Sequence, residues 1–125
     1  LRPGMHASTF GGNPIAAAAG IATIKMIEEE GLLEKGKKLA ECFKSRLKQM
    51  ANELEIIQDI RVAGAMIGIE LNIDGTSFVQ TCMEKGLLIN CTHGNVIRLL
   101  PAVNTPLELV DKALDILEET LRKGS

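Results

Sequence analysis

Hydrophobic residues recur every three or four positions between residues 14 and 54 and again after residue 105, which predicts helices in both regions. Residues 14–30 form an Ala-rich helix candidate that begins after Asn13, a preferred N-cap, and ends at Gly31. A second helix is expected over residues 32–54. The last helix should begin at Pro106, because Thr105 and Glu108 have the spacing of a capping box.

The hydrophobic period changes to two between residues 56 and 100, which predicts strands there. Residues 56–62 and 66–73 are the first two candidates. Residues 87–91 and 96–100 are two more, joined by a hairpin turn in which Gly94 and Asn95 can adopt positive φ angles. A short helix over residues 77–85 is expected between the two strand pairs.

The predicted order of elements is helix, helix, strand, strand, helix, strand, strand, helix, which is typical of an α+β fold. Tight turns favour antiparallel pairing, so we expect a small, mostly antiparallel sheet with helices on one face. The predicted organisation is a loop and a long linking helix over residues 1–30, followed by a small α+β domain over residues 31–125.

The amino-acid composition argues against several classes of function. The 125 residues are 46% hydrophobic and 24% charged, which is typical of a globular protein. A net charge of −2, with no Trp or Tyr, argues against nucleic-acid binding, and the longest apolar stretch is too short to cross a membrane. Three cysteines without a C-x-x-C motif favour a reducing, cytoplasmic setting. The first residue is Leu, so we expect the chain to begin inside a longer reading frame or to have been processed or cut.

Two neighbouring hydroxyl side chains, Ser8 and Thr9, precede a glycine pair and the predicted start of a helix. Such a place suits an anion, because hydroxyls and free backbone N–H groups can point at it and the helix dipole is positive there. The alternative interpretation is that both residues only shape the turn.

Arg98 lies within an apolar strand candidate, residues 96–100. A guanidinium keeps its charge, so a buried one needs an acidic or carbonyl partner, and no nearby acid is an obvious match. Arg98 therefore either extends to water or pairs with a substrate or a further region of the protein. Cys91 and His93 lack further ligands at a recognised spacing, so no metal site is expected.

Three segments together resemble the class III, ornithine-type, pyridoxal-phosphate aminotransferases. Residues 6–14 (HASTFGGNP) look like the family motif H-G-S/T-T-F/Y-G-G-N-P, with Ala7 in place of the usual glycine. Residues 66–71 (MIGIEL) resemble the strand that enters the family's small C-terminal domain. Residues 86–101 are similar to the corresponding run in acetylornithine aminotransferases.

The resemblance implies roles for three residues. Thr9 matches the threonine that binds the cofactor phosphate of the opposite subunit in the family's homodimer, and Ser8 matches a neighbour that lies against the substrate. Arg98 matches an arginine that pairs with a gating glutamate of the large domain and can meet a substrate carboxylate. The Schiff-base lysine and the acid that holds the pyridine nitrogen belong to that large domain. No catalytic residue is therefore expected in this chain, which should be inactive alone.

The implied fold is the C-terminal small domain of a fold type I pyridoxal 5'-phosphate enzyme. The implied reaction moves an amino group from N-acetylornithine, or a related ω-amino donor, to 2-oxoglutarate in arginine biosynthesis. Ornithine, succinylornithine and 4-aminobutyrate transaminases are alternatives within the family. A non-catalytic α+β binding or dimerisation module is the alternative from another class.

Overall fold

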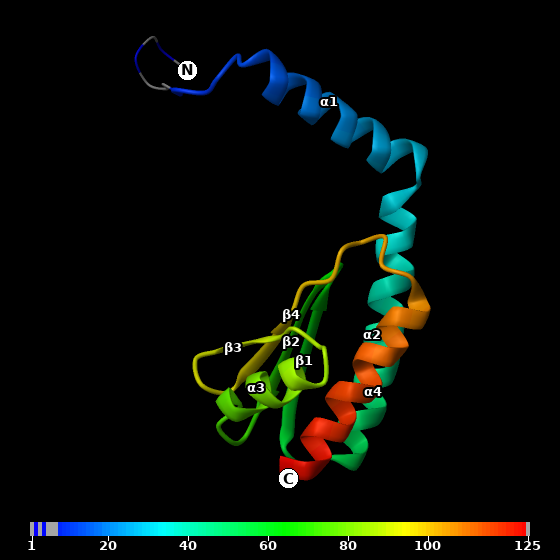
Figure 1. Cartoon of the computed structure of the whole chain (residues 1–125). Helices are drawn as coiled ribbons and strands as arrows, with labels where there is room; N and C mark the ends of the chain where they lie inside the picture. The colour runs from blue at the N-terminus through cyan, green and yellow to red at the C-terminus, as the bar shows by residue number, and fades with distance from the viewer. Residues whose placement is uncertain (1, 3, 5–7, 125) are drawn as a thin grey trace. The chain divides into compact units, whose positions relative to one another are not determined.

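The computed structural model describes residues 2, 4 and 8–124 (Figure 1). The chain divides into two compact units, Leu1–Leu33 and Glu34–Ser125, and each is described by itself. Within the described residues, the elements are α1 (Pro14–Glu29), α2 (Leu32–Glu53), β1 (Ile57–Ala63), β2 (Met66–Leu71), α3 (Thr76–Glu84), β3 (Asn90–Thr92), β4 (Val96–Leu99) and α4 (Leu107–Gly124). This order confirms the predicted α+β fold. No helix in the described residues is long and apolar enough to span a membrane.

The first unit contains α1, which begins and ends as predicted. The side chain of Asn13 accepts hydrogen bonds from the backbone N–H groups of Ile15 and Ala16, at 2.9 and 3.3 Å. Gly31 follows the helix with a φ of 60°, the left-handed conformation that a glycine adopts without strain. Every residue of α1 is exposed or half-buried, although the helix is rich in alanine and isoleucine.

The second unit contains an antiparallel sheet with the order β1-β2-β4-β3 in the described residues. The strands β1, β2 and β4 lie within two residues of their predicted bounds. The strand β3 differs, because it covers Asn90–Thr92 rather than residues 87–91. The N–H of Leu87 donates to the carbonyl of Cys82 at 2.8 Å and closes the end of α3, and Leu88 is 80% exposed. Residues 87–89 therefore lie outside the sheet.

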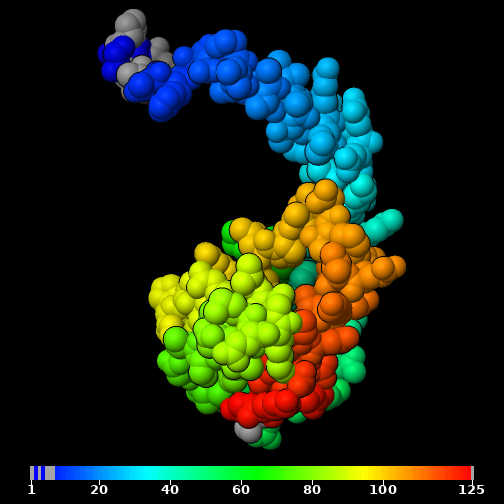
Figure 2. Space-filling view, in the orientation of Figure 1, coloured from blue at the N-terminus to red at the C-terminus, as the bar shows by residue number. Residues whose placement is uncertain are grey.

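Alternation along the strands places one row of apolar side chains against the helices. Ile67 and Ile69 of β2 and Ile97 of β4 are fully buried, and α2, α3 and α4 contribute to the same core. Figure 2 shows α3, in yellow-green, against the red C-terminal half of α4. The fully buried residues with large side chains are Phe43, Leu39, Leu47, Met50, Ile67, Ile69, Leu71, Ile97, Leu114, Leu117, Leu121 and Val110. The other sheet face is open, as expected for helices on one face.

The hairpin turn between β3 and β4 uses different residues from those predicted. His93 and Gly94 have positive φ angles, 55° and 78°, and His93 is the only described non-glycine residue of this kind. Asn95 instead donates from its side chain to the carbonyl of Leu71 at 3.1 Å, while the Leu71 N–H donates to the Asn95 carbonyl at 2.9 Å. Asn95 thus ties the turn to the end of β2.

The predicted capping box at the start of α4 is wrong, and the helix begins one residue later than predicted. The hydroxyl of Thr105 donates to the carbonyl of Ala102 at 2.7 Å, which closes the preceding turn. The carbonyl of Pro106 accepts from Leu109 and Val110, at 3.0 and 3.2 Å, so the helix begins at Leu107.

Candidate functional site

The residues expected to bind cofactor and substrate lie in both units. Ser8 and Thr9 belong to the loop before α1, and Arg98 belongs to β4. His6 and Ala7, the first two residues of the nine-residue motif, lie outside the described residues.

A tight turn leads from the hydroxyl residues into α1. The N–H of Asn13 donates to the carbonyl of Phe10 at 3.2 Å, and Gly12 inside this turn has a φ of 79°. A Cβ atom added at Gly11 would lie 3.1 Å from the Cβ of Ser8. The glycine pair therefore serves two needs, since Gly12 supplies the positive φ and Gly11 leaves room for Ser8.

The hydroxyls of Ser8 and Thr9 are exposed, and neither forms a hydrogen bond with the described part of the chain. The expectation of free N–H groups at the helix start is wrong, however. Pro14 has no N–H, and those of Ile15 and Ala16 already donate to the Asn13 side chain. The donors available to an anion therefore belong to the loop, where the two hydroxyls lie ahead of the positive end of the helix dipole.

Arg98 lies on the open face of the sheet. Its neighbours Ile97 and Leu99 are buried among the helices, so the alternation of the strand turns Arg98 away from the core, where it is exposed. Within the described residues Arg98 is exposed, which is compatible with both alternatives open from the sequence, contact with water or with a partner outside this chain. Within residues 8–124 it forms no ion pair.

A shallow pocket of about 230 Å³ lies beside Arg98. Across the sheet, Arg98 pairs with Gly68 of β2, and Gly68 pairs with Arg61 of β1, so the two arginines flank a residue without a side chain. The pocket is lined by Arg61, Ala63, Met66, Ile67, Gly68, Val96 and Arg98. The guanidinium of Arg98, at the edge of this open pocket, is placed where it can bind a carboxylate.

Arg61, unlike Arg98, has acidic partners. Its Nη1 lies 2.8 Å from the carboxylates of both Asp59 and Glu70. The hydrogen bond to Glu70, followed by the charges of both acids, raises the pKa of Arg61. This cluster of charges was not predicted from the sequence. Its signal was the alternation of Asp59 and Arg61 with the apolar Ile60, which places both charges on one face.

Comparisons with known proteins show the family of the chain. The family model for class-III aminotransferases matches residues 1–121. The chain is 44% identical over 117 residues to the acetylornithine aminotransferase of Methanothermobacter thermautotrophicus, a match that covers 94% of this chain and 30% of that protein. It is 41% identical over 117 residues to the ornithine aminotransferase of Staphylococcus carnosus, with 94% of this chain and 29% of that protein covered.

Solved structures give the same result. The acetylornithine aminotransferase of Elizabethkingia anophelis superposes with a TM-score of 0.88 at 33% identity, over 98% of this chain and 33% of that one. The ornithine aminotransferase of Plasmodium yoelii superposes with a TM-score of 0.91 at 29% identity, over 100% of this chain and 34% of that one. The chain spans about a third of the length of these relatives. With a match along almost its whole length, it belongs to the class III aminotransferase family.

Proposed function

We propose that this chain is the C-terminal part of a pyridoxal 5'-phosphate aminotransferase that moves an amino group from N-acetylornithine, or a related ω-amino donor, to 2-oxoglutarate. The observation that supports it most is the family match over residues 1–121. Similar relatives are named acetylornithine aminotransferase and ornithine aminotransferase. We favour N-acetylornithine as the donor because residues 90–95 resemble the acetylornithine enzymes.

The loop before α1 has the chemistry that a cofactor phosphate requires. The exposed hydroxyl of Thr9 would donate to a phosphate oxygen of the cofactor held by the opposite subunit, and Ser8 would lie against the substrate. Each charge-assisted hydrogen bond of this kind is worth about 1.5–3 kcal/mol. When bound, pyridoxal phosphate serves as the electron sink that makes the carbon bearing the amino group acidic.

Arg98 has the properties of a carboxylate ligand. It is exposed, it has no ion-pair partner in residues 8–124, and its planar fork can bind a carboxylate through two hydrogen bonds. In this proposal Arg98 pairs with a gating glutamate of the large domain and is released when a carboxylate of 2-oxoglutarate arrives. Its part in the reaction is to bind and orient, without touching the transferred proton.

The surface of α1 fits a chain that works within a larger assembly. Ile15, Ile21 and Ile24 are more than half exposed, and apolar side chains in water gain free energy when another surface covers them. We propose a homodimer, in which the loop before α1 reaches the opposite subunit's cofactor. The free thiols of the three cysteines favour a reducing compartment, so we place this enzyme in the cytoplasm.

The test is the amino-transfer activity of the full-length protein loaded with pyridoxal phosphate. Formation of glutamate from 2-oxoglutarate would be compared for N-acetylornithine, ornithine, succinylornithine and 4-aminobutyrate. We expect the largest kcat/KM with N-acetylornithine. A preference for another of these donors would correct the substrate. An absence of transfer from all four, in cofactor-loaded protein, would favour a non-catalytic module.

A further inference from the structure

The open face of the sheet has four charged groups on neighbouring cross-strand rows. In one row, Arg61 and Arg98 flank Gly68. In the next row, Asp59 pairs with Glu70, which in turn pairs with Val96. Cross-strand partners and residues two apart share a face, so these two arginines and two acids lie on the same surface.

The charges on this surface are paired unevenly. Both acids lie 2.8 Å from the single Nη1 of Arg61, whereas Arg98 has no ion pair in the described part of the chain. Glu70 is nevertheless the diagonal neighbour of Arg98 across β2 and β4. Diagonal cross-strand residues lie within reach of each other when their side chains are long. Glu70 therefore has two arginines on its own face and contacts only one.

We propose that Arg61 is a positioning residue that holds Glu70 away from Arg98 and so keeps the Arg98 guanidinium available to a carboxylate of the substrate. This inference rests on the proposed role of Arg98 as a carboxylate ligand. Arg61 acts through Glu70 and needs no contact with the substrate.

The reason is competition between a tethered and a free carboxylate. A group fixed on the same sheet is present at an effective concentration in the millimolar range, which a free dicarboxylate must exceed to occupy the same guanidinium. Without Arg61, the acids Asp59 and Glu70 would lose their common partner, and Arg98 would be the remaining arginine on that face. Glu70 would then occupy Arg98 and exclude the ligand.

The test uses the full-length protein loaded with pyridoxal phosphate and glutarate, an unreactive dicarboxylate, as the probe. Binding of glutarate would be measured by calorimetry for the wild type, Arg61→Gln, Glu70→Gln, Arg61→Gln/Glu70→Gln and Arg98→Gln. We expect Arg61→Gln to raise the glutarate Kd about tenfold and the double variant to return it to within about twofold of wild type. The KM for 2-oxoglutarate should rise in Arg61→Gln and return towards the wild-type value in Arg61→Gln/Glu70→Gln, with kcat of these two variants little changed.

These variants test the proposed role of Arg98 as a carboxylate ligand separately from the positioning role of Arg61. If Arg98→Gln leaves the glutarate Kd unchanged, the proposed role of Arg98 fails. If Arg98→Gln weakens binding while Arg61→Gln does not, or if the double variant stays as weak as Arg61→Gln, the positioning role of Arg61 is overturned. A structural role of Arg61 alone would not be rescued by Glu70→Gln, since that change removes another partner of the same cluster. Thermal unfolding of each variant confirms that all are folded.

Discussion

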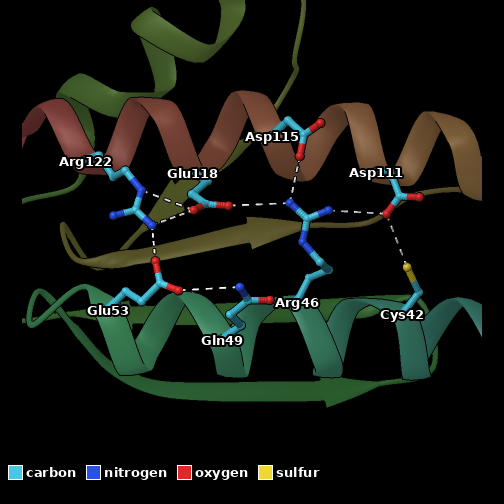
Figure 3. Close-up of polar contacts among 8 residues, drawn as sticks. All are labelled: Cys42, Arg46, Gln49, Glu53, Asp111, Asp115, Glu118 and Arg122. Carbon is cyan, nitrogen blue, oxygen red and sulfur yellow. Dashed lines mark hydrogen bonds and ion pairs between the residues drawn. The ribbon is translucent and has the colours of Figure 1, made fainter.

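Arg46 of α2 and Asp115 of α4 form an ion pair of 2.7 Å on the outer side of the two helices (Figure 3). The same guanidinium lies 3.5 Å from Asp111 and 3.5 Å from Glu118. Farther along, Arg122 of α4 contacts Glu53 of α2 as well as Glu118, the latter at 2.7 Å. Two arginines thus neutralise the negative charges of Asp111, Asp115 and Glu118 on α4 and link α4 to α2.

Replacing Arg46 by Met should lower the free energy of unfolding by about 1–2 kcal/mol. Exposed ion pairs contribute little one by one, but this change leaves Asp111 and Asp115 without their shared cation, and like charges four residues apart on a helix repel. Urea denaturation at low and high salt would measure it, and the loss should shrink in about 1 M salt. Lys44→Met, on an exposed position of the same helix, is the control and should stay within about 0.5 kcal/mol of wild type.

Glu119 should make stability depend on acid pH. Its hydrogen bond with Lys123, and then that with Lys85, lowers its pKa from 4.5 to about 2. Because the folded pKa lies below the unfolded one, the stabilisation is complete above about pH 4.5 and is lost as the pH falls through about 2. Unfolding free energies over this range should fall less steeply in Glu119→Gln and in Lys123→Met. Identical slopes in both variants and wild type would contradict the assignment.

Thr9→Ala should weaken cofactor retention in the full-length protein. The loss of one charge-assisted hydrogen bond, about 1.5–3 kcal/mol, corresponds to a ten- to hundredfold higher Kd for pyridoxal phosphate. Equilibrium dialysis of the cofactor would measure it. Thr23→Ala is the matched control, because Thr23 is also exposed but already donates to the Ala19 carbonyl at 2.9 Å. An equal Kd in Thr9→Ala and wild type would mean that Thr9 only shapes the turn.

Arg98→Lys should slow both half-reactions of the full-length enzyme, each by about tenfold. Lysine keeps the charge but loses the planar fork, so the step with 2-oxoglutarate loses a two-point carboxylate contact. The step with the amino donor loses the pairing with the gating glutamate. Stopped-flow absorbance would measure the steps separately, with Arg46→Lys, on the helical side, as control. Unchanged rates in both steps would mean that Arg98 is an exposed strand residue with no part in either half-reaction.

The 125-residue chain by itself should show no transaminase activity. In the proposed enzyme the Schiff-base lysine would lie in the large domain, and Thr9 would bind the phosphate of the opposite subunit's cofactor. We expect mixing with pyridoxal phosphate to produce no stoichiometric, site-specific absorbance band. Such a band, lost on substitution of one particular lysine, would contradict this prediction and assign a cofactor lysine to this chain.

Local sequence patterns predicted most of the fold, because the hydrophobic period of each helix or strand is visible within a short stretch of residues. The 3.6-residue period predicted the helices, and the alternation of Ile67 and Ile69 with Gly68 and Glu70 predicted the central strand. The predicted bounds of β3 and the predicted cap of α4 were wrong because a polar group there could choose between two hydrogen-bond partners. Leu87 uses its N–H to close α3, and Thr105 donates its hydroxyl backwards, although either could have served the next element.

The site was predictable only in part for the same reason. Arg98 stood out because a charge lies among apolar residues, but its position on the open face depends on the face to which its strand turns. Its relation to Arg61 depends on the strand register, which places both arginines opposite Gly68 although they lie far apart in the chain. The engaged N–H groups at the start of α1 could be foreseen in principle, since Asn13 was already identified as the cap.

The alternation of β2 also separates the residues that pack the core from the residues that set the chemistry of the open face. Ile67, Ile69 and Leu71 face the helices, where a change of one methylene alters packing, while Gly68 and Glu70 face the open side between them. A substitution on the open side leaves the core untouched. Such a strand can therefore change its ligand chemistry by single mutations at little cost to folding, which makes this face of the sheet an evolvable surface over an unchanged core.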